Sequence, residues 1–230
     1  MFRRKFTVSL KGGSITEKPL ILFKNEYYTV CVKPAGVTSE DGRTAGMPTL
    51  LSDNGVKPLT VHRLDREVGG VMVFANNAKT AAELSRQIAD REFRKEYLAV
   101  VSGNVADDGV LEDLLFHDRQ RNKTYVEKRE RKGVKPASLE FSKVASAETL
   151  DGELSLIRIT LHTGRTHQIR VQFGSRQHPV AGDKKYGSAV GCSVALFSRR
   201  IEFIDVGGNK VSYTALPQNE YPWSLFERFL

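Results

Sequence analysis

The sequence is poor in cysteine, in tryptophan and in long apolar runs. Its 230 residues include one tryptophan and two cysteines, Cys31 and Cys192, which lie far apart and form no Cys-x-x-Cys pair. A disulfide framework and a structural zinc site are therefore poorly supported. No apolar run approaches the roughly 18 residues that a membrane-spanning helix needs. The basic residues 1–5 are followed by polar residues and not by the apolar core of a signal peptide. We expect a cytoplasmic chain with no metal site and no membrane partner.

Basic residues are in excess and are partly clustered. The chain has 35 Lys and Arg against 27 Asp and Glu, a formal charge of +8. Residues 117–135, called here the basic segment, carry eight basic and three acidic side chains. Such a segment can attract a polyanion such as nucleic acid, although a solvated, charged hairpin has the same composition. Lys123 and Arg129 of this segment are our candidate RNA-binding residues.

Short β-rich runs dominate the chain and helical patterns are few. This pattern predicts a single α+β domain, residues 20–230, built on a mostly antiparallel or mixed sheet with few flanking helices. Residues 1–19 are predicted to be an N-terminal extension, and residues 34–59 a long loop. The predicted strands are 20–23, 27–33, 71–75, 93–101, 111–116, 124–128, 138–144, 154–161, 193–203 and 211–215. The predicted helices are 78–90, 166–173 and 223–230.

A carboxylate stands just before the apolar run 71–75, in the sequence Val-His-Arg-Leu-Asp-Arg. Asp65 lies between Arg63 and Arg66, and nearby positive charge keeps a carboxylate ionised near neutral pH. A structural salt bridge at the end of a strand would give the same pattern. The six residues alone do not separate a catalytic carboxylate from a structural one.

The strand 93–101 carries a tyrosine among alternating side chains. Alternation places Phe93, Lys95 and Tyr97 on one face. Tyr97 could be an ordinary core residue, or it could offer a ring on which a base stacks.

Residues 163–170 end a strand at a glycine and begin a predicted helix that carries two arginines. Arg165 and Arg170 would be costly to bury without an anionic partner. Asp65 or the phosphate of a ligand could be that partner, and the sequence does not decide which arginine meets Asp65. His167 is more typical of a structural histidine, because no serine or cysteine motif accompanies it.

Four stretches, taken in order, resemble the motifs of the RluA family of RNA pseudouridine synthases. They are residues 33–36 (Lys-Pro-Ala-Gly), residues 62–65 (His-Arg-Leu-Asp) with Gly69-Gly70, residues 95–98 (Lys-Glu-Tyr-Leu), and residues 164–170 with 182–183 and 186–187. Two departures stand out: residues 66–70 read Arg-Glu-Val-Gly-Gly where the family commonly has Thr-Ser-Gly, and residues 195–198 replace a common Leu-His-Ala element. The resemblance covers residues 20–215.

The resemblance implies a pseudouridine synthase fold with a catalytic cleft and no N-terminal S4 domain. It implies that an essential aspartate, Asp65, isomerises a uridine of tRNA or of 23S-type rRNA to pseudouridine without a cofactor. The base is detached, rotated and rejoined through carbon after it has been flipped out of the RNA. Whether Asp65 attacks the substrate as a nucleophile or takes a proton from the sugar, as in a glycal-type route, stays open.

The same mapping gives roles to other side chains. Tyr97 would lie against the uracil and could assist removal of the proton from C5, and Arg170 would pair with Asp65. Arg63, Arg165 and His62 would contact the RNA, with Arg63 in the gap left by the flipped base. We expect a monomer.

Two other functions remain possible from the residues. A catalytically silent RNA-binding protein on the same fold would keep the basic surface. A hydrolase or nuclease would use Asp65 with His62 and His167, and would usually need a metal or a second carboxylate.

Overall fold

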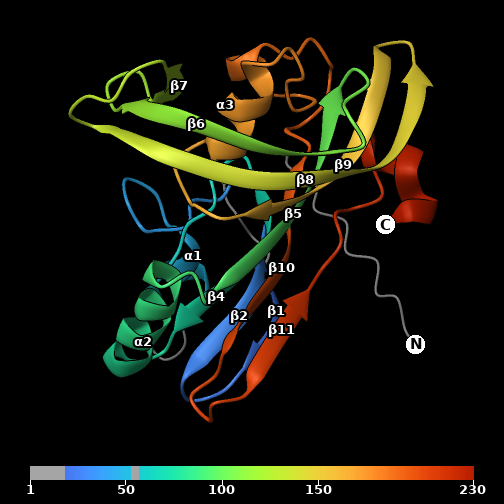
Figure 1. The fold of residues 1–230 in the computed structure, drawn as a ribbon. Helices are drawn as coiled ribbons and strands as arrows, with labels where there is room; N and C mark the ends of the chain where they lie inside the picture. Colours follow the sequence, from blue (N-terminus) through green and yellow to red (C-terminus); the bar gives the residue numbers. More distant parts are fainter. Residues whose placement is uncertain (1–18, 53–56) are drawn as a thin grey trace.

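The computed structural model describes residues 19–52 and 57–230, and within these the chain forms one mixed sheet of eleven strands. The strand order is β1-β2-β4-β10-β5-β9-β8-β6-β7, with β11 paired to β10 and β3 paired to β4 (Figure 1). The β4–β10 pair is parallel and the other pairs of this sheet are antiparallel. The predicted α+β class with a mostly antiparallel sheet is therefore confirmed.

The strands are β1 (Leu20–Lys24), β2 (Tyr28–Lys33), β3 (Leu59–Thr60), β4 (Gly69–Ala75), β5 (Arg94–Ser102), β6 (Asp108–Asp118), β7 (Lys123–Glu127), β8 (Val134–Thr149), β9 (Gly152–Leu161), β10 (Leu196–Ile204) and β11 (Lys210–Thr214). The helical elements are α1 (Met47–Leu50), α2 (Ala78–Ala89), α3 (Gln168–Gly174) and the 3₁₀ turns η1 (Lys184–Tyr186) and η2 (Trp223–Phe229). Among the described residues no helix is long and apolar enough to span a membrane.

Two predicted segments differ from the structure in the kind of element that they form, and several predicted strands differ in their bounds. The loop predicted over residues 34–59 contains the one-turn helix α1, which has Pro48 in its first turn, and the first residue of the strand β3. Proline suits a first helical turn because its missing N–H would have no partner there. The predicted α-helix over 223–230 is the 3₁₀ element η2, in which Trp223 and Phe226 are both buried.

The strand β4 is buried along its whole length and separates two apolar clusters. Val71 and Val73 pack on one side with Leu84 of α2, and Met72 and Phe74 pack on the other. This two-residue alternation is what a strand covered on both faces requires. Helix α2 begins at Ala78, as predicted, and the side chain of the N-cap residue Asn77 accepts a hydrogen bond from the Thr80 backbone N–H at 2.9 Å.

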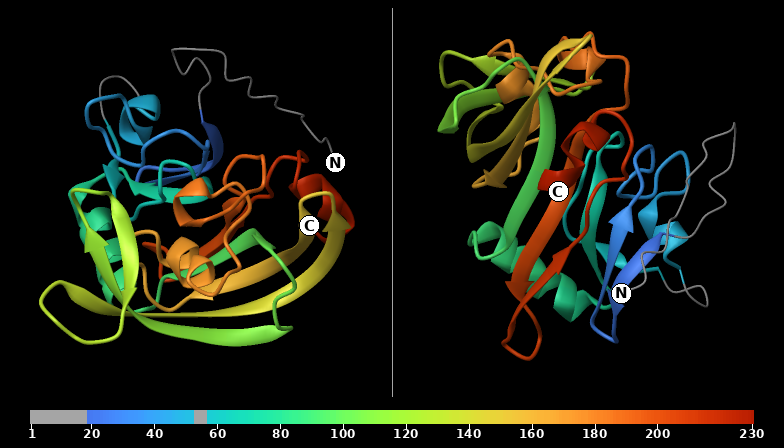
Figure 2. Two further views of the ribbon diagram at one scale, coloured as in Figure 1. Left: turned by 90° about the horizontal axis from the view of Figure 1, so that it is seen from above. Right: turned by 90° about the vertical axis from the view of Figure 1, so that its right-hand side faces the viewer.

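Helix α3 lies in the hollow of the curved sheet. Figure 2 shows the long strands β6, β8 and β9 curving around it. Val171 of α3 packs against Leu115 of β6 and Ala137 of β8, and the Gln172 side chain donates to the Leu111 carbonyl oxygen at 3.1 Å. These contacts hold the basic segment, which includes β7, beside the helix that carries Arg170.

A close approach of backbones joins β4 to β10 and β5. Gly70 pairs with Ser198 of β10, and Ser198 pairs on its other side with Tyr97 of β5. Gly70 has a φ of +127°, and a Cβ there would lie 2.4 Å from the Ser198 carbonyl oxygen. Only glycine fits this position. The register brings the segment just before β4, which contains Asp65, next to Tyr97.

We expect Gly70→Ala to lower the free energy of unfolding by about 3 kcal/mol or more, because it adds both a strained φ and a backbone clash. Chemical denaturation measures the change. Gly191→Ala is the matched control, since a Cβ at Gly191 meets nothing within 4 Å. Equal stability of the two variants would contradict the close approach of β4 and β10.

Candidate active site

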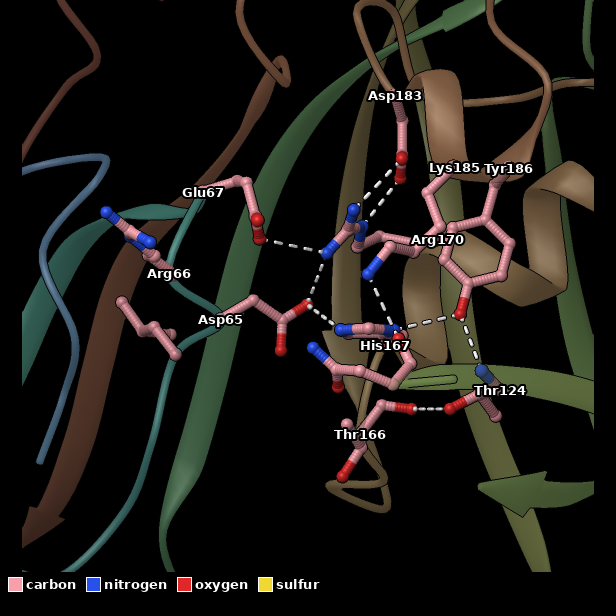
Figure 3. A network of polar contacts seen from close by, with 12 residues as sticks. Asp65, Arg66, Glu67, Thr124, Thr166, His167, Arg170, Asp183, Lys185 and Tyr186 are labelled. Carbon is pink, nitrogen blue, oxygen red and sulfur yellow. Dashed lines mark hydrogen bonds and ion pairs between the residues drawn. The ribbon is translucent and has the colours of Figure 1, made fainter. Parts of the chain in front are cut away.

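Asp65 lies at the end of a tight loop that leads into β4. Its carbonyl oxygen accepts from the Val68 N–H at 3.1 Å, which closes the turn before the strand. The side chain is 21% exposed, and its Oδ2 lies 3.1 Å from Arg170 Nη1 and 3.8 Å from His167 Nε2 (Figure 3). Arg170 is therefore the arginine that meets Asp65.

Arg170 is 2% exposed and binds carboxylates with both sides of its guanidinium group. Nε and Nη2 donate to the two carboxylate oxygens of Asp183 at 2.6 and 2.9 Å. Nη1 donates to Asp65 and also to Glu67, at 3.1 and 3.3 Å. Burial alone would lower the pKa of Arg170, but the hydrogen bonds and charges of Asp183 and Asp65 outweigh burial and raise it. The guanidinium group is thus a permanent positive charge at Asp65.

Arg165, the other candidate partner, points elsewhere. Its Nε donates to the Pro136 carbonyl oxygen at 3.0 Å. It stays a candidate for RNA contact.

Tyr97 of β5 is 5% exposed and lies close to Asp65. Burial raises the pKa of its phenol, and the negative charge of Asp65 acts in the same direction, against a hydrogen bond with Ser198 that lowers it. The phenol is therefore neutral at physiological pH. Asp65, Arg170 and Tyr97, the three predicted catalytic residues, come from three different segments and meet at one place.

His167 connects Asp65 to the basic segment. Its Nδ1 lies 2.9 Å from the Tyr186 hydroxyl, which accepts from the Thr124 N–H of β7 at 2.8 Å. Because the Tyr186 hydroxyl already accepts a hydrogen bond, we assign it as the donor to Nδ1 of His167. The neutral imidazole then carries its hydrogen on Nε2, which faces Asp65. Burial lowers the pKa of His167, while the charge of Asp65 opposes burial.

Lys33, at the end of β2, is fully buried and supports the Asp65 loop from below. Its Nζ donates to the carbonyl oxygens of Pro34, Val37 and Arg66 at 3.0, 2.7 and 3.2 Å. Burial lowers the pKa of Lys33 to about 7, although the charges of Asp65 and Glu67 act to raise it. Residues 33–36 thus help to hold the loop that contains Asp65 in place.

The predicted RNA-binding residues divide into exposed and buried ones. Arg63 is exposed and pairs with Glu40 at 3.0 Å, and Arg129 is exposed on the basic segment. Lys123 is partly buried, with its Nζ 5.5 Å from the centroid of the Tyr186 ring. These three stay predictions.

His62 is a correction. It is 6% exposed, its Nε2 accepts from the Val73 N–H at 3.1 Å, and its ring packs against Phe93. Burial lowers the pKa of His62 well below its usual value, so the ring is neutral. A side chain enclosed in this way supports β4 and does not reach RNA.

Sequence reasoning did not assign Asp183, Glu67 and Tyr186 to the site. Asp183 and Tyr186 belong to a turn-rich loop whose pattern is weak by itself. The stronger signal was the cost of burying Arg170, because its five N–H donors need more acceptors than the carboxylate of Asp65 alone supplies. No group of three or more His, Cys, Asp or Glu side chains in residues 19–52 and 57–230 is arranged to hold a metal ion.

Comparisons with known proteins agree with the fold and with the family expected from the sequence. A family model described as RNA pseudouridylate synthase matches residues 27–175. An uncharacterized RNA pseudouridine synthase of Aquifex aeolicus is 38% identical over 181 residues, which are 73% of this chain and 55% of the relative. Ribosomal large subunit pseudouridine synthase D of Borreliella burgdorferi is 30% identical over 208 residues, 82% of this chain and 62% of the relative.

The structure of human RNA pseudouridylate synthase domain containing 1 matches with a TM-score of 0.78 at 20% identity, over 93% of this chain and 89% of that one. The chain belongs to the RNA pseudouridylate synthase family. The names of the curated relatives are consistent with the RluA family expected from the sequence. The chain spans between about half and two thirds of the length of these curated relatives.

We expect Asp183→Asn to lower the free energy of unfolding by about 3 kcal/mol, because it removes the main counter-charge of a buried guanidinium group while keeping the side-chain shape. Thermal or chemical denaturation measures this. Glu127→Gln is the control, since it removes only the solvent-exposed pair with Arg131 and should leave stability nearly unchanged. A small effect of Asp183→Asn would mean that Arg170 does not depend on this pair.

Proposed function

We propose that this protein isomerises a uridine of structured RNA to pseudouridine, with Asp65 as the essential residue. The observation that carries the proposal is the Asp65 carboxylate, paired with buried Arg170 and close to the Tyr97 phenol. Membership of the RNA pseudouridylate synthase family supports the same activity.

The two oxygens of Asp65 have different surroundings. Oδ2 is held by Arg170 and faces His167, whereas no described residue makes a hydrogen bond or ion pair with Oδ1. Arg170 is then a positioning residue that keeps the carboxylate ionised and fixes its orientation. Oδ1 is the oxygen we assign to the substrate, whether it attacks carbon or removes a proton from the sugar.

Tyr97 is proposed to lie against the uracil ring. Its neutral hydroxyl could assist removal of the proton from C5, and its ring offers a flat apolar surface to the base. The target base must leave its stack to reach Asp65, at a cost of a few kcal/mol. Arg63, exposed at the mouth of the Asp65 loop, is the side chain we place in the gap that the base leaves.

The substrate is proposed to be tRNA or rRNA, bound by the basic segment. Relatives include a ribosomal large subunit pseudouridine synthase and the tRNA pseudouridine synthase C of Salmonella typhi. The basic segment lies beside the site, since Thr124 of β7 donates to Tyr186. We propose that the protein acts in the cytoplasm as a monomer, with one catalytic domain over residues 20–230.

The alternative is a catalytically silent RNA-binding protein. Such a protein would need the basic surface only. It would not need a carboxylate with one oxygen free beside a buried tyrosine, and burial of Arg170 to orient that carboxylate has no purpose in binding alone.

We expect Asp65→Asn to reduce pseudouridine formation at least about a thousandfold, because the amide neither attacks carbon nor takes a proton. RNA affinity should change by less than about twofold. Pseudouridines are first mapped in cellular RNA with and without the gene, and turnover is then followed as tritium release from RNA labelled at C5 of uridine.

The control for this variant is Asp113→Asn, which alters an arginine-paired carboxylate away from Asp65. It should retain nearly full activity. Product formation by Asp65→Asn at a rate near that of the wild type would refute the assigned mechanism, and absence of product from the wild type would refute the function.

We expect the double substitution Arg129→Glu with Lys132→Glu to weaken RNA binding and to flatten its salt dependence. Each lost phosphate contact removes about 0.7–0.9 from the slope of log K against log salt. Filter binding over a range of salt concentrations measures this. Lys79→Glu on α2 is the control for a charge reversal outside the basic segment, and equal slopes for the two proteins would leave the basic segment without a role in binding.

A further inference from the structure

Lys95 of β5 is a partly buried lysine without an acidic partner. Its Nζ lies 5.6 Å from the centroid of the Phe93 ring. Among the described residues it makes no ion pair and no hydrogen bond, whereas Lys33, the other buried lysine near the site, has three carbonyl acceptors. The Lys95 ammonium group has therefore given up much of its water without gaining a counter-charge.

Burial lowers the pKa of Lys95 to about 8, and no neighbouring charge reverses this. An ammonium group in such surroundings is costly for the free protein. Titratable groups that are perturbed by burial and lack a partner are typical of sites where a ligand completes the interaction.

The position of Lys95 places its amine between the two loops that carry the catalytic pair. Nζ lies 3.8 Å from the place where a Cβ of Gly164 would stand, at the turn that leads to α3 and Arg170. On the other side, its charge lowers the pKa of His62, in the segment that leads to Asp65. Gly164 has no side chain, so the turn leaves the amine accessible from that side.

Lys95 and Tyr97 are separated by one residue on the same strand. Side chains at such positions share a face and lie about 7 Å apart along the strand. A nucleotide spans a similar distance between its base and its own phosphate. A uridine with its base against Tyr97 would then present a phosphate to the amine of Lys95.

We propose that Lys95 binds the phosphate of the target uridine, and so holds the flipped nucleotide by its backbone while Asp65 acts on it. The inference rests on the proposed function, because it assumes that uridine enters beside Tyr97. A phosphate supplies the missing negative charge, and it restores full protonation of the amine. An uncharged oxygen of uracil supplies neither.

The first test compares Lys95→Met with Lys79→Met, both in the Asp65→Asn background so that only binding is measured. Lys79 is an exposed lysine of α2 and gives the matched loss of one charge. The probe is a synthetic hairpin that contains the mapped uridine, or unmodified bulk tRNA if mapping finds none. We expect Lys95→Met to lower affinity at least about tenfold at low salt and to reduce the salt slope by about 0.7–0.9.

The second test removes the charge from the RNA. A methylphosphonate at the phosphate of the target uridine should weaken binding of the Lys95 protein about tenfold and leave binding of Lys95→Met unchanged. If the methylphosphonate weakens both proteins equally, or if Lys95→Met binds with wild-type affinity and salt slope, the proposal is wrong. If bulk tRNA is the probe, no methylphosphonate can be placed, and the comparison of Lys95→Met with Lys79→Met alone decides whether Lys95 binds a phosphate.

Lys95→Arg distinguishes loss of the charge from a folding defect. It keeps the positive charge and should therefore recover most of the RNA affinity. Undiminished RNA binding by Lys95→Met in the Asp65→Asn background, together with normal pseudouridine formation by the Lys95→Met protein that keeps Asp65, would refute the role of Lys95 and leave the proposed function standing. Absence of pseudouridine from the wild type would refute the function, while the binding comparison still reports on Lys95.

Discussion

The guanidinium group of Arg170 is the contact on which the site depends. It is almost completely buried and is surrounded by carboxylates from two separate segments, Asp65 and Glu67 before β4 and Asp183 after α3. Asp183 is the buried member of this group and accepts two of the guanidinium hydrogen bonds, so its loss is the change that most exposes the cost of burying Arg170. The same contact joins α3 to the central sheet and orients the carboxylate that we assign to catalysis. Stability and catalysis therefore share one interaction.

The sheet makes this contact possible because it places distant segments in register. Gly70, Ser198 and Tyr97 stand side by side on β4, β10 and β5. The parallel β4–β10 pair is close because Gly70 has no side chain, and the loop that holds Asp65 is fixed from below by Lys33. Two residue types at motif positions, a glycine and a lysine, thus act on the position of Asp65 without touching a substrate.

The strands and the long helix could be predicted from sequence because their signal is local. The apolar run of β4 and the Asn77 cap of α2 are examples, and the alternation around Tyr97 gave the correct strand. The pairing of Asp65 with Arg170 was one of two open choices, because it depends on where α3 begins. His167 has a left-handed φ of 53° just before the helix, and no periodic pattern encodes that turn.

His62 and Asp183 show the limits of the motif in another way. Both are polar residues beside apolar segments, and sequence alone does not distinguish a buried polar side chain from one that faces a ligand. The Nε2 atom of His62 accepts from a backbone N–H of β4, and the carboxylate of Asp183 accepts from Arg170. In each case the deciding fact is the identity of a partner that is distant along the chain.

The hydrogen-bonded chain from Thr124 through Tyr186 to His167 has a consequence for discrimination between RNAs. Its first donor is a main-chain group of β7, so a shift of that strand changes the Tyr186 hydroxyl and then the imidazole that faces Asp65. Under the proposed function, an RNA that fits the outer surface poorly would bind less often and would also react more slowly once bound. Such discrimination between RNAs would need no direct contact between the protein and the bases next to the target uridine.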